Sequence, residues 1–196
     1  MRLNSEPTAI GIDDTRQSVF KLRCRVLKPM AEIISDKSLD AALKEIAGFS
    51  EAEVRMEING ISSVQPALVT YFIAMTEDYS EGIQSFASAM FIAIHKIFEK
   101  QFGPLQKVGT KRVEQIADRN EQVMIYVRIR QPEEAALLPA AMAGSASQPS
   151  LLAYVSESIG TAQEKLPDLS AFRQDCLVVI LKTVIDVLDS AVHPRR

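Results

Sequence analysis

Helix start and stop signals recur along the chain and constrain its fold more than any other feature of the sequence. Ser50 and Glu53 match a capping box, in which each side chain bonds the backbone amide of the other residue. Gly60 is the expected end of the helix that they begin, because glycine tolerates the left-handed turn found there. Pro66 and Pro149 suit the first position of a helix, where the amide hydrogen that proline lacks has no partner. The pattern predicts a chain built from consecutive helices.

The longest helical segment begins at Ser80 and should end at Gly103-Pro104. The segment 123–129, VMIYVRI, has the composition of a strand, but its apolar residues continue a three- and four-residue spacing that starts at Val113. This spacing favours a helix. We therefore predict an all-α fold, a single-domain multi-helix bundle of about eight helices over residues 1–196, with a loose connector near 139–149.

A short motif occurs twice in the sequence. QPALVTY at 65–71 and QPSLLAY at 148–154 share Gln, Pro, Leu and Tyr at matching positions. A polar break and a long apolar helix follow each copy, which suggests pseudo-repeats over 64–102 and 147–192. Two interpretations stay open, namely duplication of a helical hairpin and a chance match between helix-forming sequences. In both, the motif is interpreted as the start of a helix whose tyrosine packs at the edge of the core.

His95 is the strongest candidate for a chemically active residue. It lies on an apolar helical segment, and Glu99 follows one turn later, where a carboxylate raises the basicity of imidazole and fixes its tautomer. A small-ligand-binding protein or an enzyme would use a pocket between helices near His95, Tyr71 and Glu77. The interpretation that the sequence favours is a packed histidine, with the acidic turn around Glu77 in solvent.

No metal or cofactor is expected. The chain has two histidines, its cysteines Cys24 and Cys176 lack metal-ligand spacing, and the acidic residues at 77–81 match no calcium loop. The sequence also lacks the glycine-rich patterns that bind nucleotide phosphates. It has neither the apolar core of a signal peptide nor a segment apolar enough to be a transmembrane helix, so we expect a cytoplasmic protein with free thiols.

A cationic helical face formed by Lys21, Arg25 and Lys28 is the candidate surface for an acidic partner. A membrane surface and nucleic acid are alternatives, but the net charge of −3 and the lack of alternating basic and aromatic residues disfavour nucleic acid. The simplest interpretation is a solvated face, because long cationic side chains often cover apolar surface.

Together these observations favour a non-catalytic helical protein that acts through protein–protein contacts, with another protein or with itself as a homodimer. Most apolar residues of 71–102 should form core, and the remainder can supply a self-complementary face. The alternative is a small-ligand-binding protein or an enzyme with the pocket near His95. The sequence does not indicate which small molecule would bind.

Overall fold

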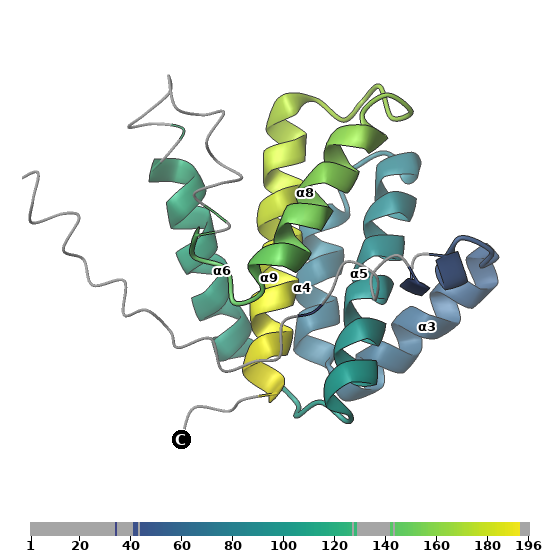
Figure 1. Ribbon diagram of the computed structural model, residues 1–196, viewed down its shortest axis with the longest axis vertical. Helices are drawn as coiled ribbons and strands as arrows, with labels where there is room; N and C mark the ends of the chain where they lie inside the picture. The colour runs from purple at the N-terminus through teal and green to yellow at the C-terminus, as the bar shows by residue number, and fades with distance from the viewer. Residues whose placement is uncertain are drawn as a thin grey trace, which may run out of the picture. The chain divides into compact units, whose positions relative to one another are not determined.

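The computed structural model describes Ile34 and residues 41–42, 44–126, 128, 142 and 144–192. All of them belong to one compact unit, residues 31–196. Within this part of the chain there is no strand, so the all-α prediction is confirmed there. The helices, labelled as in Figure 1, are α3 (Glu51–Val64), α4 (Pro66–Thr76), α5 (Glu81–Phe102), α6 (Thr110–Ile125), α8 (Pro149–Ala162) and α9 (Ala171–Val192).

Helix α9 is the central helix of this unit. Every residue from Leu177 to Leu188 is buried, which explains why its sequence is apolar on all sides rather than along one stripe. Helices α4, α5, α6 and α8 all pack against α9, and α3 packs on α4 and α5. Figure 1 shows α6 on one side of α9, with α5 and α3 on the other.

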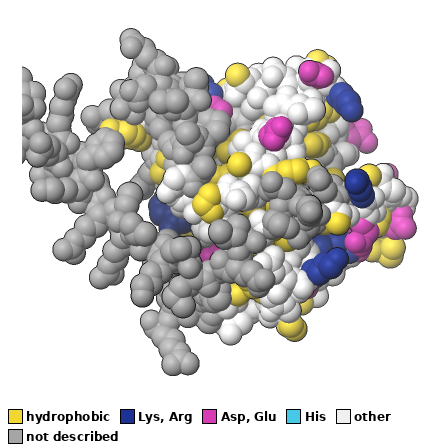
Figure 2. Space-filling view, in the orientation of Figure 1, with side chains coloured by type: hydrophobic (Ala, Val, Ile, Leu, Met, Phe, Trp, Pro, Cys, Tyr) yellow, Lys and Arg dark blue, Asp and Glu magenta, His cyan; other side chains and the backbone are white. Residues whose placement is uncertain are grey.

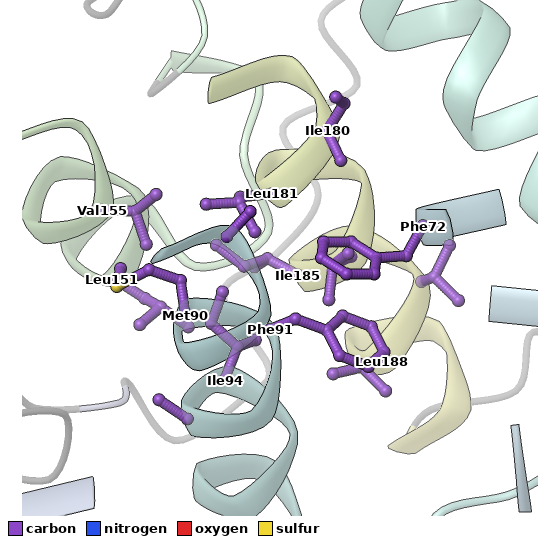
Figure 3. Close-up of a cluster of buried hydrophobic side chains, with 14 of the residues drawn as sticks. Phe72, Met90, Phe91, Ile94, Leu151, Val155, Ile180, Leu181, Ile185 and Leu188 are labelled. Atoms are coloured by element: carbon purple, nitrogen blue, oxygen red, sulfur yellow. The ribbon is translucent and has the colours of Figure 1, made fainter. Parts of the chain in front are cut away.

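The core is continuous across these helices. The rings of Phe72 on α4 and Phe91 on α5 stack with their centroids 4.4 Å apart, an arrangement that adds about 0.5–1.5 kcal/mol to the free energy gained by burial. Figure 3 shows other members of the same cluster, which come from α5, α8 and α9: Met90, Ile94, Leu151, Val155, Ile180, Leu181, Ile185 and Leu188.

The predicted capping box is present at the start of α3. The Glu53 amide donates to the Ser50 hydroxyl over 3.3 Å, and the Ser50 amide donates to the Glu53 carboxylate over 2.6 Å. Helix α5 begins after Ser80, as predicted, and ends at Gly103. Gly103 has a φ of 75°, which lies in the left-handed region that favours glycine.

The predicted helix end at Gly60 is wrong. Helix α3 continues to Val64, and Ile61 in this last turn is buried in the core. Burial of Ile61 stabilises the extra turn, and Gly60 does not have a positive φ. The helix stops at Gln65 because the ring of Pro66 disfavours helical backbone in the preceding residue.

The segment 123–129 is helical wherever the structure describes it. Helix α6 continues through Ile125, and a wider π-type turn follows at Tyr126 and Arg128. The three- and four-residue spacing therefore outweighs the strand-like composition. The first residues of the predicted connector, 139–141, lie outside the described part of the chain.

Both copies of the Gln-Pro motif begin a helix at their proline, as predicted. Gln65 and Gln148 adopt similar backbone angles, φ −129° and ψ 57° against φ −127° and ψ 80°. Both side chains are buried, and each bonds a backbone group far away in the sequence. Val108 donates its amide to Gln65 over 3.0 Å, and Ile34 donates its amide to Gln148 over 3.3 Å.

The helices that begin at the two copies pack differently. Helix α8 packs directly along α9, whereas α4 has α3, α6 and α9 as its main neighbours and meets α5 through the Phe72–Phe91 stack. The motif thus repeats as a local structure that starts a helix and holds a passing segment. Duplication of the whole hairpin stays a hypothesis.

Candidate functional site

An open groove of about 610 Å³ lies between the first half of α5 and the second half of α8. Both helices pack on α9, but the side chains of Ala89, Ser158 and Ala162 are too small to fill the space between them. From α5, the half-buried side chains of Phe86 and Ala89 border the groove, and the buried Met90 lies at its base. The groove is within the range of about 300–1,000 Å³ that is usual for binding sites in proteins.

One end of the groove is closed by the turn that follows α8. Leu166 from this turn lies against Gly82 in the first turn of α5. A Cβ atom on residue 82 would lie 3.1 Å from the Leu166 side chain, so the glycine permits this close approach. On the face drawn in Figure 2, hydrophobic side chains cross the middle of the described surface, with acidic and basic side chains around them.

Two opposite charges lie at the rim of the groove. Glu157 is on α8, and Lys165 is in the turn after it. Both side chains are exposed. Within the described part of the chain, neither forms an ion pair, although Glu157 accepts a bond through its backbone carbonyl from the Thr161 hydroxyl at 3.1 Å. Both charges therefore remain available to a group that enters the groove.

A second polar feature lies between α6 and α9, where the side chains of four of its members are buried and that of Arg119 reaches solvent. Its members, which we call the polar cluster, are Arg119 and Asn120 of α6, Ser147 before α8, and Lys182, Thr183 and Asp186 of α9. The Lys182 ammonium, which is 0% exposed, donates to Asp186 over 2.5 Å and to Asn120 over 2.9 Å. These bonds compensate much of the free energy lost when both charges leave water.

The two oxygens of Asp186 have separate sets of donors. Oδ1 accepts from the Ser147 amide at 3.0 Å and from its hydroxyl at 2.9 Å. Oδ2 accepts from Lys182, from Arg119 at 3.1 Å and from Asn120 at 3.2 Å. The cluster thus joins α6, α9 and the segment that leads into α8. Because its acceptors and donors are used on one another, its arrangement suits a structural role.

Burial acts to raise the pKa of Asp186, but the Lys182 ammonium and the bonds from Ser147 and Arg119 outweigh it, so the pKa lies below its usual value. Burial lowers the pKa of Lys182, with Asp186 acting in the opposite direction. The carboxylate is therefore held ionised by its partners. A group held in this way is a poor general acid or base near neutral pH.

His95 is buried, with 2% of its surface exposed, and neither ring nitrogen has a hydrogen-bond partner within the described residues. Its Nδ1 lies 3.4 Å from the Glu99 carboxylate, without the geometry of a hydrogen bond. Burial lowers the pKa of His95, against the opposite effect of Glu99 and Glu57. Lys96 pairs with Glu57 at 2.8 Å, which weakens the effect of Glu57 on the imidazole but leaves that of Glu99.

The other residues of the predicted pocket have different neighbours. The Tyr71 hydroxyl bonds Thr183 of the polar cluster, and burial raises the pKa of Tyr71. Glu77 is exposed, and its backbone carbonyl accepts from Gln84 at 3.0 Å. None of Tyr71, Glu77, His95 and Glu99 lines the groove between α5 and α8.

The predicted cationic face, Lys21, Arg25 and Lys28, lies outside the described residues, as does Cys24. Cys176 is a free, half-buried thiol, and burial raises its pKa. In the described ranges, no three His, Cys, Asp or Glu side chains are grouped so that they could hold a metal ion. None of the helices described is both long and apolar enough to cross a bilayer.

Neither the polar cluster nor the groove was predicted from the sequence. The signal for the polar cluster was available, since Lys182 and Asp186 lie four residues apart inside an otherwise apolar helix. The groove had no such signal. It arises where α5 and α8 lean on the same helix, and only the packed structure shows that Glu157 and Lys165 border it.

Comparison with known proteins gave no relationship: no protein-family model, no curated protein and no solved structure matches the chain.

Proposed function

We propose that this protein acts without catalysis of its own, by binding a protein partner in the groove between α5 and α8. The observation that supports this proposal is the combination of an open apolar groove with two exposed rim charges, Glu157 and Lys165, that form no ion pair with any described residue. Protein interfaces combine an apolar centre with a polar rim in this way. A partner helix that lays its apolar face in the groove would be recognised by that surface and oriented by the two charges.

The lining of the groove also suits a macromolecular partner. The half-buried Phe86 supplies aromatic apolar surface, and aromatic residues are enriched at interfaces. Ser158 and Ala162 allow a partner backbone to approach closely. The polar cluster, by contrast, uses its buried donors and acceptors internally, so the proposal gives it a structural role.

The proposal includes a cytoplasmic location. Cys176 is a free thiol, as expected for a protein in a reducing compartment. Partial burial and the raised pKa of this thiol reduce its reactivity.

Photo-crosslinking in the cells that make the protein tests this function. A benzophenone side chain introduced at Ser158 would lie in the groove, and the matched control carries the same group at Ser63, an exposed position near the end of α3. We expect a discrete covalent adduct with a protein from the Ser158 probe and none from the Ser63 probe. Equal labelling from both positions, or no adduct from Ser158, would overturn the proposal.

A small-ligand site at His95 is the second candidate. The observation that favours it is the pair of buried ring nitrogens that have no hydrogen-bond partner among the described residues, because such groups cost free energy unless something occupies their bonding positions. Melting experiments on His95→Gln, described in the Discussion, separate this candidate from a packing role.

A further inference from the structure

We propose that the partner in the groove is a second copy of this chain, bound so that α8 of one copy lies antiparallel to α8 of the other. This inference rests on the proposed function and names its partner. Each α8 would serve both as a wall of its own groove and as the helix that enters the groove of the other copy.

The charges at the rim support an antiparallel pairing. Glu157 precedes Lys165 along the chain, and Thr161 lies midway between them in the sequence. A twofold axis through Thr161 places Glu157 of each copy opposite Lys165 of the other, so that both charges gain a partner at once. A parallel arrangement would place like charges opposite each other, which is unfavourable.

The size of the side chains around Thr161 supports a close approach of the two helices. Ser158, Thr161 and Ala162, all with small side chains, line the groove on the face of α8 that the second copy would meet. The partner α8 can therefore approach at the midpoint and cover the apolar surface of Phe86.

The arrangement also limits the size of the assembly. In a twofold contact the same surface is used on both copies, so no equivalent surface is left free to add a third chain. A head-to-tail contact between the groove and a different surface would instead continue into a filament or a ring. The predicted species is a dimer.

Two charge reversals test this geometry. Glu157→Lys gives a chain with two positive rim charges, and Lys165→Glu gives a chain with two negative rim charges. We expect each variant alone to dimerise roughly tenfold or more weakly than wild type, because both pairs become repulsive. An equimolar mixture of the two variants should form a heterodimer, since each pair then joins opposite charges.

Sedimentation velocity measures all these species, and circular dichroism checks that the variants fold. Glu114→Lys makes the same charge change at an exposed position of α6 and should leave dimerisation unchanged. Wild-type protein that stays monomeric at the highest soluble concentration, or a mixture that associates no better than the single variants, would overturn the inference. The proposed function would then still stand if the Ser158 probe labelled a different protein, and would fail if that probe labelled none.

Discussion

Charged side chains have opposite environments on the two sides of helix α9. Toward α6, Lys182 and Asp186 are buried and bonded to each other and to their neighbours. Toward α5 and α8, Glu157 and Lys165 stand exposed beside an apolar groove, without an ion pair within the described residues. The number of charges near a site is therefore less informative than whether those charges already have hydrogen-bonding or ion-pair partners.

The reason for the difference is the cost of desolvation. A charge that leaves water must find compensating bonds inside the protein, so a buried charged group survives only within a nearly complete set of partners. A charge at the rim of a groove keeps its water until a partner arrives. The polar cluster can therefore stabilise the fold, whereas the groove charges can select what binds.

The largest expected effect comes from breaking the polar cluster. Asp186→Ala leaves the Lys182 ammonium buried without its counter-charge, and we expect a loss of about 3–5 kcal/mol in the free energy of unfolding, measured by urea denaturation. Asp118→Ala on α6 is the control, since Asp118 is exposed and its loss should cost little. A loss for Asp186→Ala no larger than that of the control would mean that the cluster does not stabilise the fold.

A smaller loss is expected from the buried glutamine of the first Gln-Pro motif. Gln65 accepts from the Val108 amide at 3.0 Å and donates to the Gln106 carbonyl at 2.8 Å. Gln65→Ala removes both bonds, and we expect a loss of about 1–3 kcal/mol because the buried amide of Val108 is left without a partner. Exposed Gln163, in the turn after α8, is the matched control position. A similar loss for Gln163→Ala would contradict the clamping role of Gln65.

His95→Gln should have a still smaller effect near neutral pH, about 1 kcal/mol or less, because glutamine is polar and comparable in size. The pKa of His95 lies below its usual value in the folded protein. As the pH falls through about 6.5, the unfolded chain takes up the proton first, so wild type should lose stability there and His95→Gln should not.

Thermal melting of both proteins from pH 8 to pH 5 measures this difference. Wild type that becomes more stable relative to His95→Gln as the pH falls would show that the imidazole is charged in the folded state. Stoichiometric metal in purified wild type, or a ligand whose stabilisation is lost in His95→Gln, would favour the small-ligand candidate instead.

The smallest effect on stability is expected at the groove. Glu157→Lys and Lys165→Glu change exposed residues without an ion pair in the described structure, so each should alter the free energy of unfolding of the monomer by about 0.5 kcal/mol or less. Urea denaturation under dilute conditions, where the monomer dominates, measures this. A loss as large as that of Asp186→Ala would assign these charges to the fold rather than to association.

The sequence predicted the helices better than the site. Local signals such as the Ser50 capping box and the prolines at 66 and 149 placed helix starts correctly, because capping acts between neighbouring residues. Gly60 failed as a stop signal because burial of Ile61, a tertiary effect, decided where α3 ends. The apolar residues around His95 in the sequence predict a packed histidine. The absence of hydrogen-bond partners among the described residues depends on the neighbours that the fold brings to it.

The groove could not be predicted for a related reason. Its walls come from helices that are far apart in the sequence, and small residues such as Ala89 and Ala162 give no local sign that they border an opening. The repeated motif was more informative, since both of its glutamines turned out to be buried and bonded.

Disulfide trapping at the proposed twofold axis tests the central claim most directly. Thr161→Cys, in a chain with Cys24 and Cys176 replaced by serine, places one thiol on the axis, where it would meet its copy in the partner. Ser150→Cys on the same helix is the control, because its two copies would lie about 30 Å apart at a rise of 1.5 Å per residue. We predict a covalent dimer from oxidised Thr161→Cys on a non-reducing gel and none from Ser150→Cys. Equal crosslinking of the two variants, or none from Thr161→Cys, would contradict the antiparallel pairing of α8.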